Sequence, residues 1–484
     1  MAVKKSMKST NLLSRIAEIA AVATAIALGT TGASEPAFAA TANLSPGLSA
    51  KFRPIAQLLR SASDPSASVA NIVNITKHPP LPSSLPGSYY NKWLTVADSR
   101  GRIYLVDTHI YKPGVTNPTH TIVNLATQGL DVGNPTAGNS ELGLRRITYH
   151  PDFANSSKKG YLKFYTMSCQ ALSTRTRPGA VAIEHNAPPG APTQCDNVLT
   201  EWTMDRATMT GKSPREVLRY PQLYSNHGAD ALVFDPETRL LYIATGDGGS
   251  QGDPYGVAQS KQYLYGKILR IDPTKPGATL PPNMGRAAKG TFSYPMDNPY
   301  AAPGVPGLDA IYAIGFRHPE TMIRDDRQLI VFDIGGSKFE EIDILDLDGD
   351  SGKNFGWDRV EGRSPVFTTT VPPVAGYPHI GGNKAIVGGA APESGPYAGL
   401  VILGDIVSGN LYYGDRHALE AARSWSIPMV PLRQFVMHNV SGTPQTLMQA
   451  FGRNGRVDLR LTVVDSRVFG VTKQRGIIFE ILPP

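Results

Sequence analysis

Short apolar runs of strand character, separated by turns rich in glycine and proline, constrain the fold of this chain more than any other feature. Its 484 residues include 48 Gly and 40 Pro. Short apolar runs bounded by such turn residues are typical of strands. The runs lie at 93–97, 103–106, 161–165, 240–244, 329–332, 400–403, 410–413 and 477–481. The pattern predicts an all-β fold, with one short helical candidate at 418–423.

A weak internal repeat groups these runs into pairs. Residues 147–152 are followed by a run at 161–164, and residues 232–236 by a run at 240–244. A degraded copy of the unit begins at Thr462. Each copy has the pattern of a strand, a tight turn and a second strand, which suggests the four-stranded blades of a β-propeller.

The first 39 residues have the build of a secretory signal peptide. Four basic residues precede the apolar run Ile19–Leu28, and small residues at Ala37–Ala39 surround the expected cleavage site. The apolar run is too short to span a bilayer, so no stable membrane anchor is expected. We therefore expect an exported protein, periplasmic or secreted. A loosely packed lead-in at 40–88 would precede one propeller domain at 89–484.

Charge and cysteine content narrow the choice of partners. The formal net charge is +7, but the basic residues are scattered along the chain, so nucleic-acid binding is not expected. The two cysteines are Cys169 and Cys195. In an exported protein a cysteine pair more often forms a disulfide than a metal site. We expect a disulfide that closes the intervening loop.

Five segments carry a more specific pattern. The longest runs from Asn226–Gly228 through Gly246–Pro254 to Leu264–Asp272. The other four lie at 141–153, 311–319, 335–357 and 377–409. In order and spacing the segments resemble the glucose/sorbosone dehydrogenases, which use pyrroloquinoline quinone (PQQ) and calcium. The resemblance implies a six-bladed β-propeller with four-stranded antiparallel blades that oxidises a sugar.

The resemblance places the family's catalytic residues at two positions. His227 stands at the position of the base, and an imidazole titrates near neutral pH, which suits removal of a hydroxyl proton as hydride leaves carbon. Arg317 matches an arginine that can hold the quinone oxygens and stabilise the negative charge that grows there. The alternatives are a histidine in a surface turn and an arginine that joins neighbouring blades.

Two carboxylates are candidates for contact with the substrate. Glu141 matches a polar position near the family's substrate, although a solvated loop carboxylate is the alternative. Asp247 lies in a glycine-rich turn expected at the mouth of the channel. Arg145 and Arg146 stand where the family has small and apolar residues. They could bind an acidic sugar or a phosphate, or simply be solvated.

Three further basic residues are candidates for contact with PQQ. His318 follows Arg317 where the family usually has Asn, which changes the shape of the expected cofactor pocket. A lysine that some members have near 407–409 is absent here. Arg456 and Arg460 could supply cations to the tricarboxylate instead, or could brace a blade.

Calcium is expected at two places. The resemblance implies that backbone carbonyls of Gly335 and Gly336 bind one ion, and that Glu340 and Glu341 belong to a second site. Carbonyl and carboxylate oxygens are the ligands that calcium prefers. The alternative for the two glutamates is a pair of strand-edge carboxylates.

Three functions are therefore open. The first is PQQ- and calcium-dependent oxidation of a sugar (an aldose) or related alcohol. Its electrons would pass to a separate acceptor, because no C-x-x-C-H haem motif is present. The second is a propeller that has lost the quinone and binds a glycan or a protein, which the pair Arg145 and Arg146, His318 and the missing lysine favour. The third is a calcium-assisted hydrolase. Fold alone does not decide among them.

Overall fold

The structure is a computed structural model that describes most of the chain from residue 46 onward. The described residues are 46–58, 71–81, 92–109, 111–112, 115, 117–132, 141–183, 187–305, 307–364, 367–380, 384–473 and 475–484. The chain divides into the units 1–41 and 42–484, and the expected signal peptide lies outside the described residues. None of the described helices is both long and apolar enough to cross a membrane.

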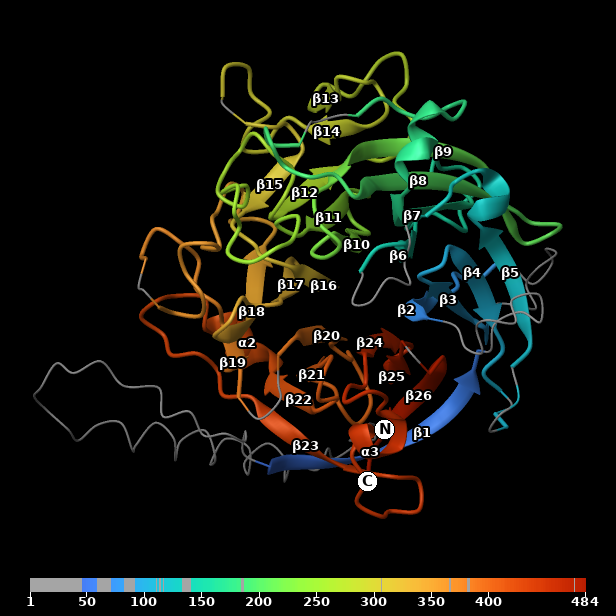
Figure 1. Cartoon of the computed structure of the whole chain (residues 1–484), viewed down its shortest axis with the longest axis vertical. Helices are drawn as coiled ribbons and strands as arrows, with labels where there is room; N and C mark the ends of the chain where they lie inside the picture. Colours follow the sequence, from blue (N-terminus) through green and yellow to red (C-terminus); the bar gives the residue numbers. More distant parts are fainter. Residues whose placement is uncertain are drawn as a thin grey trace, which may run out of the picture. The chain divides into compact units, whose positions relative to one another are not determined.

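Antiparallel sheets of four strands are the repeating element of the unit 42–484, which confirms the all-β propeller fold (Figure 1). Within the described residues, four such sheets are separate from one another. The first two contain β2 (Ile72–Lys77), β3 (Leu94–Asp98), β4 (Arg102–Val106) and β5 (Thr119–Asn124), and then β6 (Leu144–Tyr149), β7 (Lys163–Gln170), β8 (Cys195–Asp205) and β9 (Thr210–Gln222). The next two contain β10 (Ala229–Phe234), β11 (Leu241–Thr245), β12 (Lys267–Ile271) and β15 (Ile311–Ile314), and then β16 (Pro319–Asp325), β17 (Gln328–Asp333), β18 (Phe339–Asp346) and β19 (Ala375–Pro378).

The remaining large sheet has eight strands, so the described residues do not form six separate sheets. Its strands are β20 (Ile386–Ala390), β21 (Leu400–Asp405), β22 (Leu411–Asp415), β23 (Arg433–His438), β1 (Pro46–Gln57), β26 (Ile477–Leu482), β25 (Arg467–Thr472) and β24 (Leu459–Val464). β1 pairs in parallel with β23 and antiparallel with β26. It therefore joins two antiparallel four-stranded halves, and it ties the start of the described chain to its end.

The first strands of the sheets and half-sheets form a closed series of neighbours. β2 contacts β6, β6 contacts β10, β10 contacts β16, β16 contacts β20, β20 contacts β24, and β24 contacts β2. Figure 1 shows the sheets following one another around a common axis. Short elements complete the fold: the β13 (Met284–Arg286) and β14 (Ser293–Pro295) pair, the 3₁₀ helices η2 (Ala126–Gln128) and η3 (Leu172–Thr176), and the helices α2 (Arg416–Ala421) and α3 (Leu447–Phe451).

Strands of this propeller are buried on both faces where their sheet packs between two neighbours. Every residue of β11, β12 and β15 is buried, although β15 is the fourth strand of its sheet, counted from β10 near the axis. This packing explains why the sequence shows continuous apolar runs rather than the alternation expected of a sheet with one wet face.

The expectation of a loosely packed lead-in at 40–88 is corrected by β1 and β2, which both belong to the propeller sheets. Ala50, Phe52 and Ile55 of β1 are buried in the core. A proline hid this strand from sequence analysis: Pro54 adjoins a register irregularity in the pairing with β26, where a missing amide donor is tolerated.

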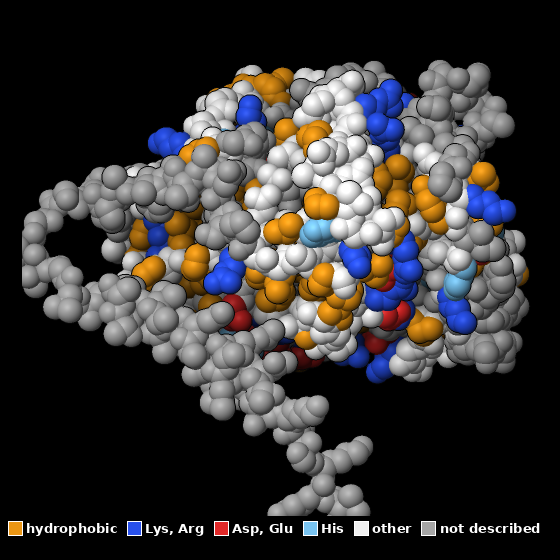
Figure 2. Space-filling model, turned by 90° about the horizontal axis from the view of Figure 1, so that it is seen from below, with side chains coloured by type: hydrophobic (Ala, Val, Ile, Leu, Met, Phe, Trp, Pro, Cys, Tyr) orange, Lys and Arg blue, Asp and Glu red, His pale blue; other side chains and the backbone are white. Residues whose placement is uncertain are grey.

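Charged side chains on the face shown in Figure 2 are interspersed with apolar and uncharged atoms, and some basic side chains lie against acidic ones. This view agrees with the scattered distribution of Lys and Arg along the sequence.

Shortening a buried side chain of β1, the strand that joins the two halves of the eight-stranded sheet, should destabilise the propeller. The Phe52 ring contacts the rings of Phe451 and Phe479, with centroids 5.3 Å and 6.5 Å apart. We expect Phe52→Ala to lower the free energy of unfolding by about 3–5 kcal/mol in urea titrations, because a buried aromatic ring is lost. Leu48→Ala on the same strand is the control, since Leu48 is 45% exposed. Equal effects of the two changes would contradict the role given to β1.

Candidate active site

The candidate site lies where the first strands of three neighbouring sheets begin. Glu141 shortly precedes β6, His227 shortly precedes β10, and Arg317 and His318 immediately precede β16. Because β6, β10 and β16 are neighbours around the axis, residues far apart in sequence converge there. The fold thus brings together Glu141, His227, Arg317 and His318, as expected from the sequence.

His227 is buried and is oriented by a carboxylate. Its Nδ1 lies 2.7 Å from Asp247 Oδ1. Trp357 Nε1 donates to Asp247 Oδ2 at 2.9 Å, and the Gly249 amide donates to Oδ1 at 3.0 Å. Asp247 is buried and both of its oxygens are engaged, so it orients His227 rather than lying at an open channel mouth. The arrangement leaves Nε2 of His227 as the ring nitrogen that can exchange a proton with a ligand.

The glycine-rich run after β11 is the tight turn that brings Asp247 to His227. A Cβ on Gly246 would lie 2.4 Å from the His227 carbonyl oxygen, so glycine is required there. His227 itself has a φ of 51°, a conformation that non-glycine residues rarely adopt outside constrained sites. Gly246 therefore allows two turns to pack closely, the turn that carries His227 and the turn that carries Asp247.

Arg317 is joined to the same turn through its backbone. Its carbonyl oxygen accepts from the Asp247 amide at 2.7 Å. Its guanidinium donates from Nη1 to the Ile334 carbonyl at 2.9 Å and lies 5.5 Å from the centre of the Trp357 ring. Its Nε is buried and has no hydrogen-bond partner in the described part of the chain. A buried guanidinium with an unused donor suits an anionic or carbonyl ligand.

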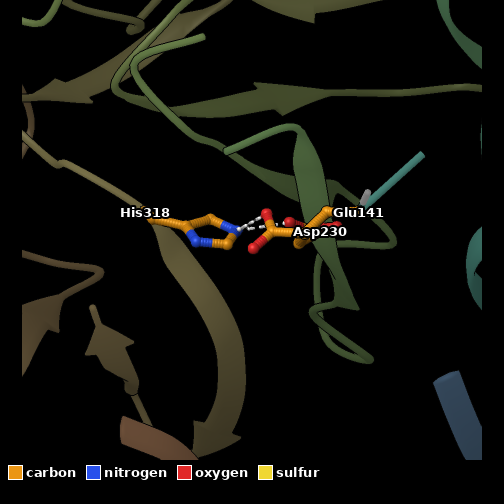
Figure 3. Close-up of side chains that lie close together, drawn as sticks. All are labelled: Glu141, Asp230 and His318. Carbon is orange, nitrogen blue, oxygen red and sulfur yellow. Dashed lines mark hydrogen bonds and ion pairs between the residues drawn. The ribbon is translucent and has the colours of Figure 1, made fainter. Parts of the chain in front are cut away.

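His318 forms a charged array with Asp230 of β10, which is buried, and with Glu141, which precedes β6 and is partly exposed (Figure 3). Its Nε2 lies 2.5 Å from Asp230 Oδ2 and 3.5 Å from Glu141 Oε2. Arg145 Nε donates to the other oxygen of Asp230. Glu141 Oε2 also accepts the backbone N–H of His227 at 2.8 Å, and the rings of His318 and His227 stack with centroids 4.9 Å apart. Glu141 therefore links the array to the candidate base.

The array holds its members in their charged forms. Burial alone would lower the pKa of His318, but Glu141 and Asp230 outweigh it and raise this pKa to about 9. Burial would raise the pKa of Asp230, yet Arg145 and His318 hold it well below its usual range. Burial also opposes ionisation of Glu141, but His318 and Arg145 keep its pKa below the usual value. At neutral pH the array thus contains two cations and two anions.

The array explains two departures from the family pattern together. Arg145 and His318, which both replace small or apolar residues, share one partner, Asp230. The solvated alternative for the arginine pair is wrong, because Arg145 is buried and Arg146 donates to the backbone oxygens of Asp230 and Glu320. Sequence reasoning missed Asp230, although a lone carboxylate inside an apolar strand run is itself a signal of a buried partner.

The other expected cofactor cations have acidic partners. Arg460 Nε lies 2.7 Å from Glu320 Oε1, and Arg456 Nη2 lies 2.5 Å from Asp458 Oδ1. Lys473, which sequence reasoning missed, is partly buried and forms no hydrogen bond or ion pair through its ammonium group with the described residues. Its pKa is lowered to about 8 by burial and then by Arg145 and Arg460. Lys473 therefore places a lysine near the array, whereas the segment 407–409, where some members of the family have a lysine, contains none.

The residues expected at calcium lie between β17 and β18 and on β18. A Cβ on Gly335 would lie 1.6 Å from the Phe339 carbonyl oxygen, so Gly335 belongs to a very tight turn; Gly336 follows it. Glu340 accepts from the Ile386 amide at 2.8 Å and pairs with His379. Glu341 accepts from the Gly362 amide. Successive side chains of a strand point to opposite faces, so the two glutamates do not share one site.

The cysteines lie at the end of β7 and the start of β8. Cys169 and Cys195 are paired as a disulfide with Cα atoms 5.7 Å apart. The bond closes the loop 171–194 close to the Glu141 side of the site, since the Cys169 amide donates to the Gly143 carbonyl.

Two of the solved structures with a similar fold are sugar dehydrogenases. The apo-form of the soluble aldose sugar dehydrogenase from Escherichia coli is 16% identical with a TM-score of 0.55, and the alignment covers 90% of this chain and 100% of that one. A glucose dehydrogenase is 14% identical with a TM-score of 0.53, covering 89% of this chain and 98% of that one. At such identities the likeness establishes the fold alone, which is the β-propeller fold of soluble sugar dehydrogenases.

Two of the chain's sequence relatives are plant proteins. The HIPL1 protein of Arabidopsis thaliana is 28% identical over 318 residues, and the HIPL2 protein of the same plant is 26% identical over 313 residues. The matches cover 57% and 55% of this chain but only 44% and 42% of those proteins, so the chain spans less than half of their length. No protein-family model matches the chain.

We expect the array to contribute measurably to stability. We expect Arg145→Met to lower the free energy of unfolding by about 3 kcal/mol or more at pH 7, because it leaves buried negative charge without one of its two cations. Adding Asp230→Asn should recover part of the loss, which a double-mutant cycle in urea would measure.

The matched control is an arginine in an exposed ion pair. Arg239 pairs with Asp152 and is 46% exposed, so Arg239→Met should change stability by no more than about 1 kcal/mol. Equal losses for Arg145→Met and Arg239→Met would show that the buried array is not a stabilising element.

Proposed function

We propose that this protein oxidises a sugar (an aldose) or a related alcohol, with His227 as the base, PQQ as the hydride acceptor and calcium as a second cofactor. The observation that carries the proposal is a buried series of two hydrogen bonds, from Trp357 to Asp247 and between Asp247 and His227. Trp357 fixes Asp247, Asp247 fixes Nδ1 of His227, and Nε2 remains for the substrate. A histidine oriented by a buried carboxylate is a recurring general base in enzymes.

The residues of the chain divide the work of the reaction as follows. His227 accepts the hydroxyl proton at Nε2, and Asp247 stabilises the imidazolium that results. Glu141, which is partly exposed beside His227, can accept hydrogen bonds from further sugar hydroxyls. Arg317 offers its free Nε to the oxygen on which negative charge develops.

The residues present fit PQQ in part. When bound, PQQ supplies the electrophilic carbonyl that accepts hydride. Arg317 has a donor to spare for it, and Lys473 supplies a cation without an acidic partner. Arg456, Arg460 and His318 are each engaged by a carboxylate and would contribute only after exchange of partners. Backbone carbonyls of Gly335 and Gly336 remain the proposed ligands of a calcium ion at the quinone.

Two architectural details belong to the same proposal. We count the two halves of the eight-stranded sheet as separate blades, which gives six blades around the axis in agreement with the closed series of first strands. We also propose that the protein is exported and passes electrons to a separate acceptor. The composition of residues 1–39 and the disulfide support export, since disulfides persist in oxidising compartments.

A second candidate function is a non-catalytic propeller that binds a glycan or a protein. The specific observation in its favour is the charged array itself. Arg145 and His318 fill positions that are small or apolar in the quinone-binding family, and Asp230 holds both in place. This candidate predicts an intact fold without quinone binding.

The decisive experiment is a titration of the purified protein with PQQ and calcium, followed through the absorbance of the quinone. A panel of aldoses and an artificial electron acceptor then tests turnover. We expect saturable binding and turnover, and we expect His227→Ala to lower kcat by about 100- to 10,000-fold while quinone binding persists. Asp247→Asn should lower kcat about 100-fold or more, because the imidazolium loses its partner.

His417→Ala serves as the control, because that histidine side chain is 84% exposed and lies far along the chain in α2. Unchanged turnover in His227→Ala would remove His227 from the mechanism. Absence of quinone binding by a protein with an intact circular dichroism spectrum would reject the dehydrogenase and leave the binding propeller.

A further inference from the structure

A buried glutamine lies between the two turns that carry the candidate base and its carboxylate. Gln222 is the last residue of β9 and is buried. Its Nε2 donates to the carbonyl oxygens of Tyr224 at 3.1 Å, Asn226 at 2.8 Å and Gly248 at 3.2 Å. An amide nitrogen carries two hydrogens, so the three acceptors share them. One side chain thus bonds to the backbone of two separate turns.

These bonds hold the peptide groups next to the candidate base and its carboxylate. Asn226 directly precedes His227, and Gly248 directly follows Asp247. Gln222 therefore holds the backbone on each side of the 2.7 Å contact between His227 Nδ1 and Asp247 Oδ1. The separation of the two side chains follows from the separation of their turns, and the Gln222 amide bridges those turns.

The segment 223–228 depends on such bonds because it lies between β9 and β10, outside the strands. Buried backbone carbonyls require donors. The Gln222 amide supplies two of them, and the Glu141 amide donates to the Ser225 carbonyl at 2.9 Å. His227 has a φ of 51°, a conformation that persists where surrounding contacts fix it. Gln222 belongs to the contacts that keep His227 in this conformation.

The neighbouring strand sets the orientation of the Gln222 amide. Asn197 lies on β8, is buried, and donates from Nδ2 to Gln222 Oε1 at 2.6 Å. With Oε1 engaged in this way, Nε2 faces the three carbonyl oxygens. Cys195 pairs with Gln222 across the β8–β9 ladder and forms the disulfide with Cys169. This end of β8 is therefore also joined covalently to β7.

We propose that Gln222, oriented by Asn197, is a positioning residue for the candidate base and fixes His227 against Asp247. Gln222 acts through the backbone of the two turns rather than through its own chemistry. The kinetic consequence rests on the proposed function, because a displaced base of about 1 Å costs about 100-fold in rate. The contact between His227 and Asp247 is a property of the protein without any ligand, so the positioning role is testable by itself.

The test compares Gln222→Met with the unchanged protein by NMR of the full chain labelled with ¹⁵N at histidine. Methionine is flexible and of similar size, but it has no N–H donor. In the unchanged protein, the Nδ1 proton that His227 shares with Asp247 should give a downfield resonance, assigned by its absence in His227→Asn. In Gln222→Met, we expect this resonance to move upfield or to be lost through exchange with water.

The fold should survive the substitution because backbone bonds also join the two turns. The Tyr224 amide donates to the Gly248 carbonyl at 2.9 Å, and the Gly246 amide donates to the Gly228 carbonyl at 2.8 Å. Should Gln222→Met fail to fold, Asn197→Leu provides the second variant. It releases Gln222 Oε1 and leaves the donors in place, so it should move the same resonance in the same direction by a smaller amount.

The matched control is a second buried glutamine of the same sheet. Gln170 is the last residue of β7, and its side chain bonds to Ser168 and Arg219 rather than to either turn. Gln170→Met should lower Tm without moving the His227 resonance. This comparison separates a positioning residue from a glutamine that only stabilises the sheet.

Turnover provides the second readout. Gln222→Met should lower kcat about 100-fold while quinone affinity stays unchanged, and Gln170→Met should leave kcat unchanged. An unchanged His227 resonance in Gln222→Met, or an equal change in Gln170→Met, would overturn the proposal even if the protein oxidises sugars. A resonance that is lost only in Gln222→Met, in a protein without turnover, would support the positioning role and reject the dehydrogenase.

Discussion

The buried interaction of Asp230 with Arg145 and His318 is the constraint on which the site depends. Asp230 lies on β10, Arg145 on β6, and His318 directly before β16, so one carboxylate joins three neighbouring sheets near the axis. Removing these charges from water is costly, and the structure offsets the cost by placing cations on both carboxylate oxygens. Glu141 and the ring of His227 are positioned by contact with the same array.

Two acidic clusters, close in space to the same turn, differ in how their charge is balanced. Glu141 and Asp230 face Arg145 and His318, so that cluster is complete within the chain. Asp333, Glu341 and Asp343 lie close together and form no ion pair with the described residues, although the charges of Arg317 and His318 oppose the rise that burial causes in the pKa of Asp333. Burial, and next the other acidic groups of the cluster, raise the pKa values of Glu341 and Asp343 well above the usual range, as expected where a counter-ion is lacking. The turn with Arg317 and His318 thus adjoins one acidic cluster that is balanced by ion pairs and one that forms no ion pair with the described residues.

Sequence alone was sufficient for the class of fold, and the roles given to His227 and Arg317 remain predictions. The short apolar runs and turn residues predicted strands, and His227 and Arg317 lie together as the resemblance implied. The strand β1 was missed because Pro54 and neighbouring charged residues interrupt its apolar pattern. Asp230 and Asp343 were missed because the burial of a carboxylate depends on neighbouring strands that local sequence does not reveal.

The chemistry expected of particular residues was harder to predict than their location. Asp247 was expected as a polar contact at an open loop, but its burial and its bonds to Trp357 and His227 make it an orienting group. Arg145 and Arg146 were expected either to bind a ligand or to be solvated, and the fold instead buries one and bonds the other to backbone carbonyls. The roles of these residues depend on partners in neighbouring sheets, and a single segment of the sequence does not reveal those partners.

The most direct test of this account is the protonation state of His318 measured by NMR of protein labelled with ¹⁵N at histidine, with the His318→Asn variant used for assignment. The chain has 10 histidines, so the spectrum is tractable. If Asp230 and Glu141 hold His318 as an imidazolium, both ring nitrogens remain protonated at pH 7.5 and the proton is lost only as the pH rises through about 9. A neutral imidazole at pH 7.5, or a transition at or below its ordinary value of about 6.5, would contradict the charged array and the positioning role assigned to it.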